Sequence, residues 1–170
     1  MQVFRVPMNR WVVLAFVILV ALIAGTVAWS FRSGLTWTAI CLIAVAGPLS
    51  LLYWYMLLVN PARAEILAND DGLMLSAPPF LDLALPWSDV VGAALVNLKS
   101  DPLYALKGVK RGMKFGSYRS GIFPLPQGGE AFVLGNSDNA VYVDAGEVKL
   151  LLAPSNPGEL LQLIEERRPR

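Results

Sequence analysis

The sequence predicts a membrane-embedded helical hairpin followed by a small, mainly-β domain that ends in one α-helix. Two long uncharged apolar runs fill the first third of the 170-residue chain. From residue 64 onward, short apolar stretches alternate with turn residues at about ten-residue intervals, as in antiparallel sheets. A helix-start signal then precedes a final apolar stripe. We therefore divide the chain into a membrane part, residues 1–62, and a β domain, residues 63–170.

The membrane helices are expected at about residues 11–31 and 37–58. The first run lies between Arg10 and Arg32, and the second stays uncharged until Arg63. Both reach the length of about 20 mostly apolar residues that crosses the hydrocarbon core. The first run also exceeds the apolar core of a signal peptide, about 7–15 residues, which predicts an uncleaved helix. The short link, residues 30–34, predicts a hairpin with both chain ends on one side.

Basic residues beside the runs predict the orientation of the hairpin. Arg5, Arg10 and Arg63 lie on the side of the chain ends, and only Arg32 lies in the turn. Because short cytoplasmic segments are enriched in Lys and Arg, we expect the β domain in the cytoplasm. Neither run contains a charged residue, which transporters and pores usually need inside the membrane. The runs therefore predict an anchor and not a transport pathway.

Small residues recur at four-residue spacing in the first run. Ala21 and Gly25 form one pair, and Ala24 and Ala28 form another. Such spacing lets two helices approach closely. Packing within the hairpin is one interpretation, and a self-association face that produces a homo-oligomer is the other.

The β domain is expected to contain seven or eight strands. They are predicted at residues 63–68, 73–77, 80–85, 90–98, 117–125, 130–135, 140–144 and 148–153, with an ordered loop or partial strand over 99–116. Gly72 is expected to supply a positive φ in the first turn. Asn156 as N-cap, Pro157 at the first helical position and Glu159 in a capping box predict a helix over residues 157–168. Together these elements predict a barrel with one open end that the helix closes.

Three segments of this domain then resemble a known family. Residues 87–90 (Trp-Ser-Asp-Val), residues 116–123 (Gly-Ser-Tyr-Arg-Ser-Gly-Ile-Phe) and residues 153–161 resemble bacterial pleckstrin-homology (PH)-like domains. The resemblance covers about residues 63–168 and departs from the family at Leu160, where an aromatic residue is common. It implies a PH-like barrel of about seven strands, anchored by membrane spans in the bacterial inner (plasma) membrane. The family has no general catalytic activity and no agreed ligand, so the resemblance assigns no site residues.

Composition argues against several kinds of chemistry. The chain has no histidine and a single cysteine, Cys41, which excludes Ser-His-Asp triads and thiolate clusters. Residues 64–170 hold ten Lys or Arg and thirteen Asp or Glu, a balance that does not favour nucleic acid as a partner. Asp70 and Asp71 directly precede Gly72 and are interpreted as turn residues. We therefore expect no enzyme activity, no metal and no cofactor.

One basic segment interrupts this mildly acidic domain. From Lys99 to Arg119 there are six basic residues and one acid, Asp101. The candidate contact residues are Lys107, Lys110, Arg111, Lys114 and Arg119. They can bind an anionic lipid headgroup or an acidic protein, or form a solvated loop that neutralises the domain.

The features together predict a membrane-anchored PH-like interaction module. It would present a sheet edge or loop at the cytoplasmic face to a protein partner or an anionic lipid. The alternative is a small accessory subunit of a larger membrane complex, in which the hairpin makes the contacts.

Overall fold

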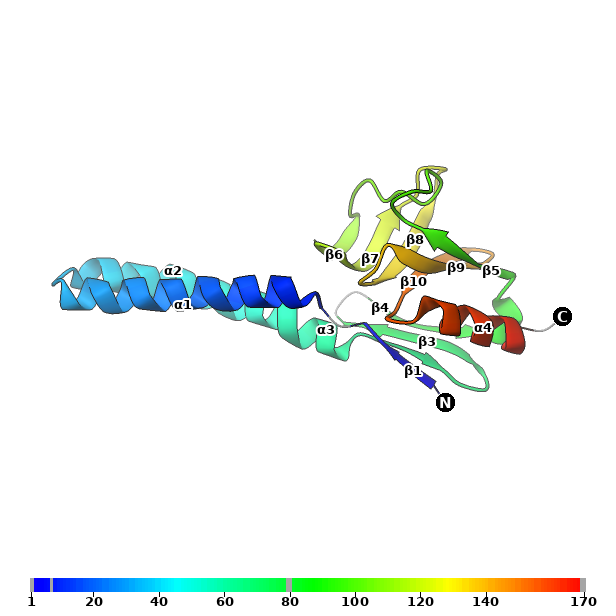
Figure 1. Ribbon diagram of the computed structural model, residues 1–170, viewed down its shortest axis with the longest axis horizontal. Coiled ribbons are helices and arrows are strands. Elements are labelled where there is room, and N and C mark those ends of the chain that lie inside the picture. The colour runs from blue at the N-terminus through cyan, green and yellow to red at the C-terminus, as the bar shows by residue number, and fades with distance from the viewer. Residues whose placement is uncertain (1, 7, 79–80, 169–170) are drawn as a thin grey trace. The chain divides into compact units, whose positions relative to one another are not determined.

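The computed structural model describes residues 2–6, 8–78 and 81–168 (Figure 1). It divides into a helical hairpin, residues 10–60, and a β unit that combines residues 1–9 with residues 61–170.

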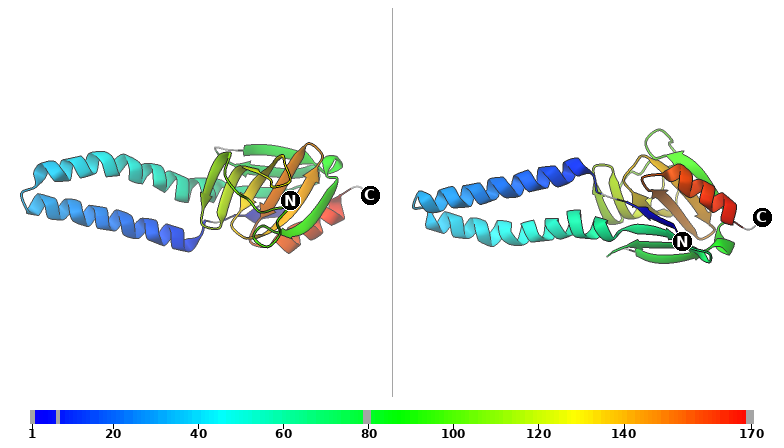
Figure 2. Two further views of the ribbon diagram at one scale, coloured as in Figure 1. Left: turned by 90° about the horizontal axis from the view of Figure 1, so that it is seen from above. Right: turned by 60° about the horizontal axis from the view of Figure 1, so that its bottom comes forward.

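The structure confirms two long apolar helices close to the predicted bounds. Helix α1 covers Arg10–Arg32, and α2 covers Thr36–Trp54. The second helix continues through a π-helical turn, η1 (Tyr55–Val59), into the short α3 (Asn60–Arg63). Arg10–Arg32 and Thr36–Arg63 are long and apolar enough to cross a membrane, with mean hydropathies of 2.7 and 1.9. The two long helices lie side by side in both figures and are joined by a tight turn in which Gly34 has a φ of 78° (Figures 1 and 2).

A narrow seam holds the two helices together. On α1 the less exposed positions recur every three or four residues, as in coiled-coil packing. They are Phe16, Val20, Ile23, Val27 and the buried Ser30, and on α2 they are the buried Ala39 with Leu42, Ala46 and Ser50. The remaining apolar surface is exposed, including Trp11 at 73% and Leu51 at 66%. A surface of this kind requires a lipid or protein environment.

The β unit contains two separate sheets. The first is an antiparallel meander of β1 (Gln2–Arg5), β2 (Glu65–Ala68), β3 (Gly72–Ala77) and β4 (Leu81–Pro86). The second has the spatial order β5-β9-β10-β8-β7-β6, with β10 and β8 parallel and the other pairs antiparallel. Its strands are β5 (Gly92–Asn97), β6 (Arg111–Phe115), β7 (Tyr118–Pro124), β8 (Glu130–Gly135), β9 (Asn139–Ala145) and β10 (Val148–Ala153). Helix α4 (Pro157–Arg167) follows.

The predicted barrel with one open end does not form, because the sheet does not close. The described strands number ten, in sheets of four and six that no strand pairing joins. Between β4 and β5 the chain forms a 3₁₀ turn, η2 (Trp87–Asp89), and so leaves the first sheet. The buried Trp87 fixes this exit, because its indole Nε1 donates to the carbonyl oxygen of Asn69 at 3.0 Å.

The amino-terminal strand also differs from the expected layout. Residues 2–5 pair with β2 in an antiparallel register that places Phe4 opposite Ile66 and Arg5 opposite Glu65. Phe4 and Val6 are buried. A boundary at residue 62 therefore assigns this segment to the wrong part of the chain. The hairpin is inserted between the first and second strands of the β unit.

Side chains cover both faces of the six-stranded sheet. Along β10, Leu150 and Leu152 point to one face, and Leu151 and Ala153 point to the other; all are buried. Figure 1 shows the first sheet and α4 on one side and the loop between β5 and β6 on the other. In that loop, Tyr104 and Leu106 pack over the apolar cluster that contains Leu151. The loop expected over residues 99–116 is thus ordered, and it ends in the short strand β6.

Two local expectations need correction. Gly72 does not have a positive φ; a Cβ there would come within 2.1 Å of the carbonyl oxygen of Leu85 on β4, so close packing requires the glycine. Asn156 occupies the N-cap position of α4 but forms no side-chain bond to the helix backbone. Its amide instead lies 3.3 Å from the Glu159 carboxylate.

Candidate functional site

The predicted basic residues lie on the six-stranded sheet and its covering loop. Lys107 and Lys110 are in the loop, Arg111 and Lys114 are on the edge strand β6, and Arg119 is on β7. The register places Lys114 directly opposite Arg119. The fold therefore brings the predicted cluster to one edge of the sheet.

Two of these five residues are neutralised by carboxylates. Lys110 forms an ion pair with Glu130. The Arg119 guanidinium donates to Asp138 Oδ1 at 2.7 Å and to the Ser137 carbonyl at 3.1 Å, and its side chain is only 12% exposed. Arg119 therefore fixes the turn between β8 and β9 and is not available to a ligand.

The other three basic side chains are exposed and lie outside these ion pairs. Lys107, Arg111 and Lys114 are exposed, and no ion pair involves them among the residues that the structure describes. Near them the loop exposes two aliphatic side chains, Leu103 at 53% and Val109 at 41%. Exposed Lys and Arg can form charge-assisted hydrogen bonds to phosphate or carboxylate groups. We call these three basic side chains, which lie along one edge of the sheet, the basic surface; Lys114 projects to the face of the covering loop, and Arg111, opposite Ile122, projects to the other face.

The two predicted pairs of small residues lie on different sides of α1. Ala24 and Ala28 line a groove of about 510 Å³ beside the contact between α1 and α2, with Ala46 and Gly47 on its other wall. Ala21 and Gly25 line a separate hollow of about 320 Å³ on α1, with Leu22, Thr26 and Trp29. A Cβ added at Gly25 would meet nothing within 4 Å. Ala21 and Gly25 therefore form an open face of the hairpin.

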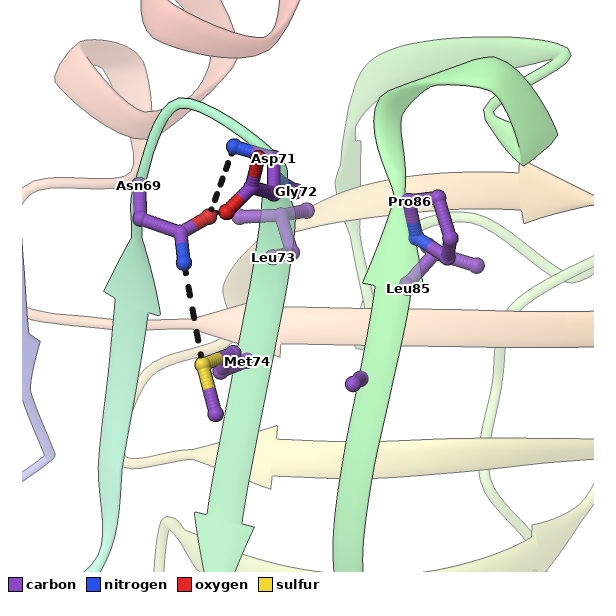
Figure 3. A pocket seen from close by; sticks show the side chains of 8 residues that line it. Asn69, Asp71, Gly72, Leu73, Met74, Leu85 and Pro86 are labelled. Carbon is purple, nitrogen blue, oxygen red and sulfur yellow. Dashed lines mark hydrogen bonds between the residues drawn. The ribbon is translucent and has the colours of Figure 1, made fainter.

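A third hollow lies on the outer side of the four-stranded sheet (Figure 3). It has a volume of about 200 Å³ and is mainly apolar, with Met74, Ala84, Leu85 and Pro86 among its lining residues. Asn69 and Asp71 stand at its polar end. The Asn69 side-chain oxygen accepts from the backbone N–H of Asp71 at 3.1 Å and of Gly72 at 2.7 Å, which confirms the predicted turn.

The adjacent acids, Asp70 and Asp71, play different parts. Asp70 lies 2.5 Å from the Arg167 guanidinium of α4, and this hydrogen bond and charge lower the pKa of its carboxyl. The pair joins the first turn to the terminal helix. The Asp71 side chain is exposed and contributes only negative charge to the hollow. Within the described ranges no group of three or more His, Cys, Asp or Glu could hold a metal ion.

Sequence reasoning identified the basic segment but not which cations are free. The partner of Lys110, Glu130 on β8, is 20 residues further along the chain, and the partner of Arg119, Asp138 in the turn before β9, is 19 residues further. It also missed the hollow of Figure 3, since its walls come from strands whose register was not known.

Comparisons of the chain with protein-family models, with curated proteins and with solved structures found no match. The PH-like resemblance therefore rests only on the motifs at residues 87–90, 116–123 and 153–161.

Proposed function

We propose that this chain is a membrane-anchored interaction module with a PH-like β domain. In this proposal the hairpin lies in the bacterial plasma membrane and holds the β unit at the cytoplasmic face. The basic surface then contacts an anionic lipid headgroup or an acidic protein. The observation that carries the proposal is the joining of two exposed apolar helices to a folded β unit with free cations.

The pairing of β1 with β2 supports the hairpin topology. Residues 2–5 precede the helices and residues 65–68 follow them, yet the two segments share a sheet. Both must therefore lie in the same compartment, so the chain crosses the membrane an even number of times. Two crossings fit the length and hydropathy of the helices.

The orientation can be tested with accessible cysteines. In a chain with Cys41→Ser, single cysteines at Ser88 and at Ser33 would report the β unit and the helix turn. We expect an impermeant maleimide to label Ser88→Cys only after cells are broken, and Ser33→Cys in intact cells. The reverse pattern would place the β unit outside the cytoplasm.

Anion binding can be tested on the full chain in nanodiscs of neutral phosphatidylcholine. These discs are mixed with sucrose-loaded vesicles that contain phosphatidylglycerol, and sedimentation measures the bound protein. Replacing Lys107, Arg111 and Lys114 with Glu should abolish binding, since each basic side chain contributes about 1 kcal/mol near an anionic surface.

Lys149→Glu is the control, because it reverses one basic charge on β10, which β8 and β7 separate from the edge strand β6. If the unmodified chain does not bind the vesicles, or if the triple variant still binds them, an anionic lipid is not the ligand of the basic surface. The protein arm would be tested with the same variants, by crosslinking in native membranes and affinity purification. A partner retained equally by the triple variant would not use this surface.

The alternative function, an accessory subunit of a larger membrane complex, is favoured by the open Ala21 and Gly25 face. Replacing both residues with Leu fills that face without touching the β unit. If the hairpin makes the contacts, copurification of the complex should be lost while the β unit keeps its unfolding transition. Unchanged copurification would count against this alternative.

A further inference from the structure

The outer face of the four-stranded sheet carries an unexpected row of apolar side chains. The strand register places Val3 of β1 beside Leu67, Leu67 beside Met74, and Met74 beside Ala84. Val3 is 45% exposed and Met74 is 46% exposed. A sheet that covers a core with one face normally places polar side chains on the other. The row runs across all the strands of the sheet and ends at the hollow of Figure 3.

Carboxylates surround this apolar row. Glu65 and Asp82 lie on the same face of the sheet, and Asp71 lines the hollow. Arg5, opposite Glu65, is the basic residue on this face among those described. We call this surface the acidic face; its apolar row and negative charge fit a partner with exposed aliphatic and basic side chains.

The same chain carries such a surface on the opposite side of the β unit. Figures 1 and 2 show the first sheet on one side of the six-stranded sheet and the loop between β5 and β6 on the other. That loop exposes Leu103 and Val109, and the free cations Lys107 and Lys114 accompany them. Lys114 shares its sheet face with Phe123, which packs in the cluster under the loop.

We propose that the acidic face of one copy binds the loop of a second copy, together with the free cations Lys107 and Lys114 of the basic surface. The contact is heterologous, since it joins two different surfaces, and repetition produces a ring or a row of copies. Confinement to one membrane raises the effective concentration of copies, so a weak contact is sufficient. This inference rests on the proposed function, because it names the partner of the same basic surface.

Mixed crosslinking tests the proposal on the full chain. Two differently tagged forms, both with Cys41→Ser, carry Met74→Cys or Leu103→Cys and are reconstituted in the same liposomes of neutral lipid. A short bismaleimide should join the two forms to each other. Each form alone should give no more dimer than a control with Leu95→Cys, a 54% exposed position on β5. A form with both cysteines should give a ladder of multimers.

Charge reversal then tests the complementarity. Asp71→Lys with Asp82→Lys in the Met74→Cys form should lower mixed crosslinking about fivefold, the effect expected of two exposed ion pairs. When this reversed Met74→Cys form is mixed with a Leu103→Cys form that carries Lys107→Glu and Lys114→Glu, the crosslinks should be restored. Such rescue requires that both variants fold.

Three results would overturn the proposal. Mixed crosslinks could be no stronger than those of the Leu95→Cys control, the Met74→Cys form could dimerise by itself, or Asp71→Lys with Asp82→Lys could leave the mixed crosslinks unchanged. If mixed crosslinks are absent but nanodiscs still bind anionic vesicles through the basic surface, only the second-copy inference fails. If both are absent and the triple reversal also leaves every copurifying partner unchanged, the proposed function fails as well.

Discussion

At the scale of single residues, Tyr118 is the clearest source of pH dependence. Its side chain is fully buried on β7, and its hydroxyl has no hydrogen-bond partner in the described part of the chain. Burial raises its pKa from 10.0 to about 12, against a smaller opposing effect of the Ser120 side chain. The raised pKa means that the folded state holds the proton more tightly than the unfolded state.

This difference makes the unfolding free energy depend on pH. The stabilising contribution is complete below pH 10 and is lost as the pH rises toward about 12, where the folded protein also ionises. The loss amounts to about 2 to 3 kcal/mol at 1.36 kcal/mol per pKa unit. Tyr118→Phe should therefore show a smaller loss of unfolding free energy over this range, measured by urea unfolding in detergent. Parallel losses in the two proteins would contradict the assignment.

Gly72 is the second residue with a specific structural requirement. A Cβ at this position would come within 2.1 Å of the Leu85 carbonyl oxygen, a backbone atom that cannot move independently of β4. We expect Gly72→Ala to destabilise the β unit by about 2 kcal/mol or more through this overlap. Gly108→Ala is the matched control, because nothing lies within 4 Å of its Cβ position and its φ is not positive. Equal unfolding midpoints for the two variants would refute this account.

At the scale of elements, β1 places one buried and one exposed side chain at neighbouring positions. Phe4 is buried in the β unit, whereas its neighbour Val3 is 45% exposed on the outer face. Phe4→Ala should cost about 3 kcal/mol of unfolding free energy, as large-to-small changes in cores do. Val3→Ala should change it by less than about 0.5 kcal/mol. Limited proteolysis and thermal unfolding of the full chain would measure both, and similar effects would show that β1 does not stay paired.

The elements that sequence reasoning found and missed differ in the range of their contacts. The two long helices and the strands at residues 130–135 and 148–153 were predicted closely, because length, hydropathy and adjacent turns are local signals. Strand β1 was missed because its four residues are too few for a periodic pattern and its partner lies beyond the whole hairpin. Strand β6, Arg-Gly-Met-Lys-Phe, has a glycine and charges where a strand pattern needs apolar residues, so tertiary pairing with β7 decides its structure.

At the scale of the whole molecule, the barrel was wrong for a related reason. Closure depends on pairing between strands such as β4 and β5, and nothing in their residues specifies whether they pair or separate. The 3₁₀ turn at Trp87 separates them. The candidate site shows the same limit: the basic segment was visible in composition, but its free cations depend on Glu130 and Asp138, which the fold supplies.

The insertion of the hairpin between β1 and β2 leads to a prediction for the whole chain. Residues 6–9 and 61–64 connect paired strands, so they can serve as a hairpin loop if residues 10–60 are replaced by a short Gly/Ser linker. Antiparallel neighbours need loops of only about 2–5 residues, and loop-closure entropy grows slowly with length. We therefore expect the excised protein to fold as a soluble β unit with one unfolding transition. A fragment of residues 61–170 has lost β1 and exposes β2 as an unpaired edge, so it should unfold at lower urea concentration and associate. Size-exclusion chromatography and urea unfolding of both proteins test this, and equal stability would show that β1 is dispensable to the β unit.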